Sequence, residues 1–227
     1  MSSPISYARA LARYHLRHRI LGRPTKRRIL HEMKCIFVHV PKTGGNSVTT
    51  ALNAISPTAP GRLYPTLSKH SKAHEVRAAV GDEIWDRYFS FAIVRNPWDL
   101  MVSSYHWWLQ KARKWRKFDV DVRRIEAMDG FSEYIQSEYG TTMINRRPGA
   151  VYDWISADGE VIVDHVGKLE NMPQEWAHIC QCLGIDVALP YLNRTERRDY
   201  RDYYTDETRQ LVAERFARTI EAFEYEF

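Results

Sequence analysis

Short apolar runs alternate with helix-like segments along most of the chain. Residues 35–40, 89–94 and 161–166 are almost continuously apolar, which predicts short strands buried on both faces of a sheet. Apolar spacing and helix-starting residues predict helices over 46–55, 72–88, 130–138, 174–183 and 205–223, and from Pro97 into the charged stretch 111–124. Strands that alternate with helices indicate an α/β fold with three layers, in which helices flank a mainly parallel central sheet.

Turn-forming residues separate these elements. The segments 56–68 and 140–150 are expected to be loops, because they are rich in Pro, Gly and polar residues. At the start of the last helix, Thr205 is followed three residues later by Thr208, where a capping box has Glu or Gln. The box is therefore predicted to be incomplete.

The basic residues are concentrated at the N-terminus. The chain has 227 residues and a formal net charge of +5, a length that suits one domain. Residues 1–34 hold nine Lys and Arg and one acidic residue, whereas residues 35–227 hold 24 basic and 27 acidic residues. We therefore expect a basic N-terminal arm, 1–34, and a single α/β domain, 35–227. No nucleic-acid partner is expected, because the globular part is slightly acidic.

The compartment is inferred from the arm and the cysteines. No stretch approaches the roughly 18 consecutive apolar residues that span a membrane, and the arm is broken by arginines where a signal peptide is apolar. Contact with an anionic membrane surface through this arm is an alternative to a solvated helix. Three cysteines are too few for a disulfide framework, so the cytoplasm is the expected location.

The segment 40–47, VPKTGGNS, joins the first predicted strand to a helix. At such a junction the backbone N–H groups and the helix dipole attract anions. The residues that can contact a phosphate or sulfate here are Lys42, Thr43, Gly44, Gly45, Asn46 and Ser47. A nucleotide-hydrolysing P-loop has its lysine after the second glycine, whereas Lys42 precedes both. The alternative is a plain strand–turn–helix junction with an incidental lysine.

A second segment has the same layout. Arg95 follows the second predicted strand, at the carboxyl end where open α/β sheets bind ligands, and Ser103 lies about two turns into the next helix. An arginine fork with a hydroxyl suits a second phosphate group. The alternative is that Arg95 pairs with a carboxylate such as Asp99, with Ser103 on the helix surface.

Two anion-binding segments from one sheet imply a ligand with two separated anionic groups. In this order, PKTGGNS and VRNPWDLMVSSY resemble the two cofactor loops of the sulfotransferases that use 3′-phosphoadenylyl sulfate (PAPS), especially the carbohydrate (family 2) branch. The C-terminal segment 189–227 is similar to that branch as well. The resemblance, over about residues 35–227, implies a P-loop-like sulfotransferase fold, PAPS as co-substrate, and a small-molecule or glycan acceptor. No metal is expected, because the chain lacks the HExxH pattern of a zinc hydrolase.

The resemblance also implies roles for single residues. Lys42 would stabilise the leaving phosphate, residues 43–47 would bind the 5′ group, and Arg95 with Ser103 would bind the 3′-phosphate. The family often has a second arginine five residues after the first, where this chain has Leu100, so that contact is absent or supplied elsewhere. In the segment 193–198, Arg197 or Arg198 is placed near the nucleotide phosphate.

A proton acceptor is needed when a hydroxyl attacks sulfur, and histidine titrates closest to neutral pH. Two candidates lie between the segments, His70 and His74, and the resemblance favours His70 as the base. Their i, i+4 spacing lacks the HExxH pattern of a zinc site. His39, within the first strand, is interpreted as a core histidine.

Two other functions remain open at this point. A nucleotide-dependent phosphotransferase would also bind two phosphate groups, although it needs Mg²⁺ and a lysine in another position. A binding module without catalysis would act through the basic arm.

Overall fold

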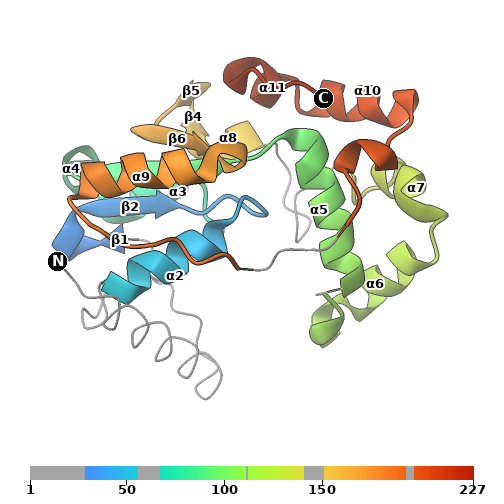
Figure 1. Ribbon diagram of the computed structural model, residues 1–227, viewed down its shortest axis with the longest axis horizontal. Coiled ribbons are helices and arrows are strands. Elements are labelled where there is room, and N and C mark those ends of the chain that lie inside the picture. Colours follow the sequence, from blue (N-terminus) through green and yellow to red (C-terminus); the bar gives the residue numbers. More distant parts are fainter. Residues whose placement is uncertain (1–28, 56–66, 111, 141–150, 193–196) are drawn as a thin grey trace. The chain divides into compact units, whose positions relative to one another are not determined.

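The computed structural model describes residues 29–55, 67–110, 112–140, 151–192 and 197–227 (Figure 1). Contacts divide the chain into two units, Met1–Val94 with Ile155–Leu192 and Arg95–Trp154 with Asn193–Phe227. The first contains the sheet, and the second is helical. The single domain expected over 35–227 stays a prediction.

A mainly parallel sheet forms the centre of the first unit. Its strands, in the order β1–β2–β3–β6, are β1 (Ile29–Leu30), β2 (Cys35–Val38), β3 (Phe89–Val94) and β6 (His165–Lys168). β1 pairs antiparallel with β2, whereas β2 and β6 run parallel to β3 on its two sides. All four residues of β2 are buried, as the apolar sequence predicts for a strand covered on both faces.

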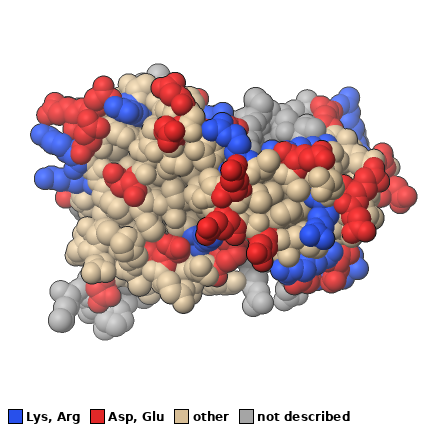
Figure 2. All heavy atoms as spheres, turned by 90° about the horizontal axis from the view of Figure 1, so that it is seen from above, with Lys and Arg blue, Asp and Glu red and all other residues tan. Residues whose placement is uncertain are grey.

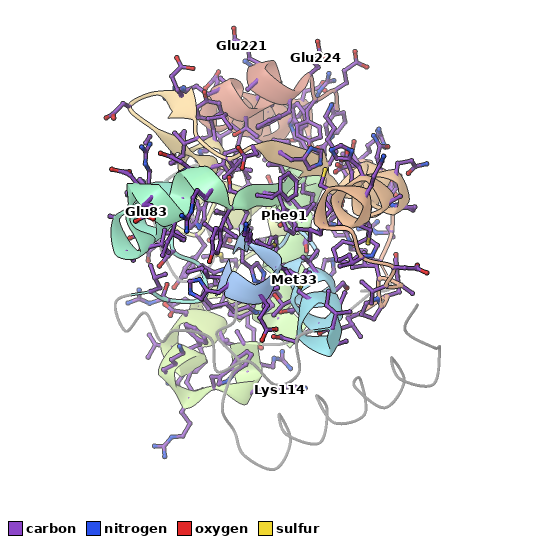
Figure 3. All side chains as sticks on the ribbon, turned by 90° about the vertical axis from the view of Figure 1, so that its left-hand side faces the viewer. Met33, Glu83, Phe91, Lys114, Glu221 and Glu224 are labelled. Atoms are coloured by element: carbon purple, nitrogen blue, oxygen red, sulfur yellow. The ribbon has the colours of Figure 1, made fainter. Side chains whose placement is uncertain are left out.

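Helices lie on both sides of this sheet, and Figure 3 shows them as separate layers. They are α2 (Gly45–Ile55) and α9 (Met172–Leu183) on one side, and α3 (Ala73–Val80) and α4 (Asp82–Arg87) on the other. Leu52 of α2 and Ile179 of α9 share a core with Phe37 and Phe91 of the sheet, whose rings stack at a centroid distance of 5.0 Å. The predicted α/β class with a mainly parallel, helix-flanked sheet is therefore confirmed.

The second unit is built around one long helix. Its helices are α5 (Pro97–Gln110), α6 (Asp119–Glu126), α7 (Gly130–Gln136), α10 (Asp206–Arg215) and α11 (Ala217–Phe223), together with α8 (Val151–Ile155) except for its last residue. α5 packs against α7 and α10. The fully buried Tyr134 of α7 donates a hydrogen bond to Ser104 Oγ of α5 at 3.1 Å, and burial raises the pKa of its phenol.

The third parallel strand differs from the prediction over 161–166. Glu160–Val161 forms β5 and pairs with β4 (Ser156–Ala157) across an Asp158–Gly159 turn in which both residues have positive φ, 50° and 89°. Parallel pairing with β3 starts at His165. The reason is Asp164, whose carboxylate accepts hydrogen bonds from the backbone N–H and the hydroxyl of Ser90, both at 2.7 Å.

Two predicted helices are shorter than expected. α5 ends at Gln110, and two 3-10 turns follow, because Trp115 folds back to stack on Trp107 with a centroid distance of 6.0 Å. The helix predicted over 205–223 bends at Phe216 into α10 and α11, which buries Thr219 so that its hydroxyl accepts from Tyr152 N at 3.2 Å.

The capping box that begins α10 is complete, contrary to the prediction. Thr208 N donates to Thr205 Oγ1 at 3.2 Å, and Thr205 N donates to Thr208 Oγ1 at 3.0 Å. The threonine hydroxyl thus does what a glutamate carboxylate does in the usual box.

Some of the remaining predictions concern residues that the structure does not describe. The sheet begins at Ile29, before the predicted domain start at residue 35. The arm up to residue 28 and most of the loops predicted over 56–68 and 140–150 lie outside the described residues. In the part of the chain that is described, no helix has the length and apolar character needed to cross a membrane.

Candidate active site

The turn between β2 and α2 has an unusual backbone. Lys42 and Gly44 both have positive φ, 66° and 76°. Glycine adopts this left-handed region freely, but a lysine there costs on the order of 1 kcal/mol. Thr43, between them, is completely buried, whereas Lys42 is only partly buried. Surrounding contacts must therefore hold the turn that presents Lys42.

Hydroxyl groups supply part of that support. Thr43 Oγ1 donates to Val40 O at 3.0 Å, and Ser47 Oγ accepts a hydrogen bond from Leu192 N at 3.2 Å. A threonine hydroxyl has a single proton, so this bond makes the Thr43 side chain a brace of the turn. The predicted roles of Thr43 and Ser47 in binding a phosphate group stay predictions.

Gly44 and Gly45 are each required for a different steric reason. A Cβ atom on Gly45 would lie 2.2 Å from Nε2 of His39, and one on Gly44 would lie 2.8 Å from Cδ1 of Leu169. The first contact holds the start of α2 against the end of β2. The second packs the turn against the residues that precede α9. No larger residue fits at either position without displacing its neighbour.

His70 is anchored to the residue that follows β2. Its Nδ1 lies 3.0 Å from the carbonyl oxygen of His39, and the two imidazole rings meet edge to face at a centroid distance of 4.7 Å. A carbonyl only accepts hydrogen bonds, so Nδ1 bears a proton, and in a neutral ring the lone pair is then on Nε2. This is the tautomer that a base acting through Nε2 requires.

The other histidines differ from His70 in position. His74 is exposed in the first turn of α3, and which of the two histidines is the base stays a prediction. His39 is buried, as expected of a core histidine, but it also contacts both Gly45 and His70. In the sequence, the only sign of these two contacts was that His39 lies just before the turn.

Lys69 was missed by the sequence analysis. Its Nζ donates a hydrogen bond to Asn46 Oδ1 at 2.6 Å, which brings a second ammonium group to the turn. Asn46 is exposed on the first turn of α2. The sequence pointed to this contact only through the position of Lys69 directly before His70. Its ammonium group increases the positive potential where α2 begins.

Arg95 opens the second unit and follows the last residue of β3 directly. Its Nε and Nη2 atoms donate to Asp99 Oδ2 at 2.8 and 2.7 Å, the pairing foreseen as the alternative to phosphate binding. Arg197 Nη2 donates to the other carboxylate oxygen of Asp99. Ser103 lies one turn after Asp99 on α5 and is buried rather than on the helix surface. Whether Arg95 and Ser103 bind a phosphate stays a prediction.

Large, mostly buried side chains lie around Asp99 and its two arginines. Tyr204 donates to Trp98 O at 2.9 Å, and burial, together with the negative charge of Asp99, raises the pKa of its phenol. Leu100 is almost completely buried, so its side chain belongs to the core of the second unit. The structure thus shows why this position is apolar. Among the described residues, no group of three His, Cys, Asp or Glu is arranged to hold a metal ion.

The site combines a glycine turn that presents a lysine after a buried strand with an anchored histidine, on an α/β fold. The chain belongs to the sulfotransferase family, whose sequence model matches residues 27–226. Sulfotransferases transfer a sulfuryl group to an acceptor, and the match confirms the resemblance seen in the two loops. In addition, a segment of 114 residues is 26% identical to an uncharacterized protein of Archaeoglobus fulgidus, covering 50% of this chain and 82% of that protein.

The contact between Gly45 and His39 predicts a coupled effect of two substitutions. Gly45→Ala is expected to lower the free energy of unfolding by about 1–3 kcal/mol, because the new Cβ displaces the imidazole. In a His39→Ala background the same change should cost far less, which chemical denaturation of the four proteins measures. Equal costs in both backgrounds would show that the ring does not set the requirement for glycine.

Proposed function

We propose that this sulfotransferase takes its sulfuryl group from PAPS and transfers it to a hydroxyl group of a carbohydrate. The observation that supports this best is the turn after β2. It holds Lys42 at positive φ, and His39, the residue after β2, anchors the ring of His70 through its carbonyl. Lys42 has the charge that a departing phosphate needs. His70 has the lone pair that an attacking hydroxyl needs.

Transfer requires one bond to form as another breaks. The acceptor oxygen attacks sulfur in line, its proton passes to Nε2 of His70, and a new S–O bond forms. The bond between sulfur and the bridging oxygen breaks, and its electron pair stays on the phosphate. Lys42 stabilises the negative charge that develops there, an interaction that grows in the transition state and therefore accelerates the reaction.

The donor also needs a place for its 3′-phosphate, and we assign this to Arg95 and Ser103. β2 and β3 are parallel neighbours, with Val38 paired to Ala92, so the segments after them leave the same edge of the sheet. Ligands bind at the carboxyl edge of such sheets. The helix dipole of α5, whose first residue is Pro97, favours an anion near Arg95.

The carbohydrate acceptor rests on the branch of the family that the two loops resemble. On the face shown in Figure 2, acidic and basic side chains are interspersed. Such a surface has no large field of one sign, which suits a small acceptor better than a long polyanion. No continuous basic stripe of the kind that tracks a nucleic-acid backbone is visible on that face. A glycan or small-molecule acceptor in the cytoplasm, with the basic arm as a membrane contact, completes the proposal.

Lys42→Ala tests the donor site. The variant is expected to bind adenosine 3′,5′-bisphosphate (PAP), the product left by PAPS, at least tenfold more weakly than the wild type. Thermal shift measures this, because a ligand at about 100 times its dissociation constant adds roughly 2.7 kcal/mol of stability. Lys34→Ala is the matched control, since Lys34 is an exposed lysine that also has positive φ, 47°. Equal loss in both variants, or none in Lys42→Ala, contradicts the assignment.

His70→Ala against His74→Ala tests the base. Release of PAP from PAPS, measured with a mixture of monosaccharides and oligosaccharides as acceptors, should fall by about 100-fold or more in His70→Ala. His74→Ala, an exposed histidine on α3, should retain near wild-type rates. PAP binding should be unchanged in both proteins. If His74→Ala loses activity instead, His70 is not the base.

A further inference from the structure

The segment that follows α5 is both basic and aromatic. Residues 112–118, ARKWRKF, contain four basic and two aromatic side chains, and none that is acidic or has a hydroxyl or amide group. They form two 3-10 turns, Ala112–Lys114 and Arg116–Phe118, and all four basic side chains are exposed. The chemistry proposed above uses none of these residues.

Trp115, between the two turns, is held rigidly and is exposed. Its backbone N–H donates to Ala112 O, and its carbonyl accepts from Phe118 N, both at 2.9 Å. The indole stacks on Trp107 with a centroid distance of 6.0 Å, yet 46% of the Trp115 residue is exposed. A large aromatic side chain is thus fixed at the surface before any partner binds.

The positive charges around Trp115 are mostly not neutralised. Among the described residues, Arg113 forms an ion pair with Glu126, whereas Lys114, Arg116 and Lys117 form none. Like charges so close in the chain repel one another, and an external anion would remove that repulsion. The surface around Trp115 therefore complements a partner with negative charge.

A second apolar side chain is exposed close by in the sequence. Val120, in the first turn of α6, has an exposed fraction of 56%. Large exposed apolar side chains are few among the described residues, and two of them, Trp115 and Val120, lie five positions apart beside the basic residues. This surface complements a partner that is apolar as well as anionic.

We propose that residues 112–120 form a docking patch for a membrane surface that contains anionic phospholipids. Tryptophan favours the interface between lipid and water, because its ring is apolar and its N–H can donate to a polar group. Basic residues near such a surface are attracted by the anionic headgroups, each by roughly fivefold in partition. The patch provides both interactions on a short, rigid segment.

A carbohydrate chain fits this patch less well. Sugar hydroxyls are bound through side chains that both donate and accept hydrogen bonds, such as amides, and residues 112–118 contain no such side chain. An exposed valine also adds nothing to the binding of a soluble polyanion, whereas it contributes apolar area at a lipid surface. The combination therefore favours a membrane.

Trp115→Ala tests the apolar part of the patch. Co-sedimentation of the full chain with vesicles of phosphatidylcholine and phosphatidylserine should show a partition at least fivefold lower than for the wild type. Tyr191→Ala is the matched control, because Tyr191 is 83% exposed but residues 184–192 contain no Lys or Arg. Its partition should remain within twofold of the wild type.

Quenching by brominated phosphatidylcholine in the same vesicles gives a readout that does not depend on losing affinity. The wild-type tryptophan emission should fall on these vesicles. Trp115→Phe keeps a ring to stack on Trp107, and its emission should fall by less than half as much. Equal quenching of both proteins would show that Trp115 does not reach the lipid.

A triple substitution tests the basic part of the patch. Replacing Lys114, Arg116 and Lys117 with Gln should lower the partition to anionic vesicles at least tenfold. The matched control removes the same charge from three exposed arginines elsewhere in the second unit: Arg201, Arg209 and Arg218. That control should stay within twofold of the wild type, which separates local docking from attraction by net charge.

Three results would overturn the inference. The first is a wild-type partition that does not rise when phosphatidylserine is added to the vesicles. The second is a wild-type partition in both Trp115→Ala and the triple variant, which would assign binding to another segment such as the basic arm. The third is retention on a sulfated polysaccharide column that the triple variant loses, without binding to vesicles, which would assign the patch to a soluble polyanion.

Discussion

The close contact between His39 and Gly45 is the constraint on which the site depends. It brings the first turn of α2 against the end of β2, so the residues between them must form a compact turn with two positive φ angles. The same histidine offers its backbone carbonyl to His70, which fixes the tautomer of that ring. A single buried residue thus couples the conformation of the turn that holds Lys42 to the orientation of the His70 ring. Any side chain at position 45 would break this coupling.

The sheet supplies the stiffness that this arrangement needs. β2 and β3 are buried on both faces, and their core residues interlock with α2 and α9. Strain of about 1 kcal/mol at Lys42 is small against the burial of such a core. The proposed chemistry uses this rigidity, because a lysine and a histidine held in place before the substrate binds need no reorganisation during transfer.

Local patterns in the sequence predicted most of the fold and the position of the turn that holds Lys42. The strands over 35–40 and 89–94 and the turn VPKTGGNS were visible because apolar runs and paired glycines are local signals. The third parallel strand was placed too early, because its start depends on a hydrogen bond between Asp164 and Ser90, 74 positions apart. Arg197 could not be assigned to Asp99 for the same reason. Contacts across such distances arise from the fold, and no spacing rule predicts them.

The central claim is that this sulfotransferase moves a sulfuryl group from PAPS, and isotope transfer measures that directly. Purified protein would be incubated with ³⁵S-labelled PAPS and a mixture of carbohydrates, in buffer with EDTA, and both products would be quantified. The account predicts that label appears in the carbohydrate fraction in amounts equal to the PAP released. It also predicts that this transfer continues without Mg²⁺. Label that remains in PAPS, or transfer that appears only with ATP and Mg²⁺, would contradict the account.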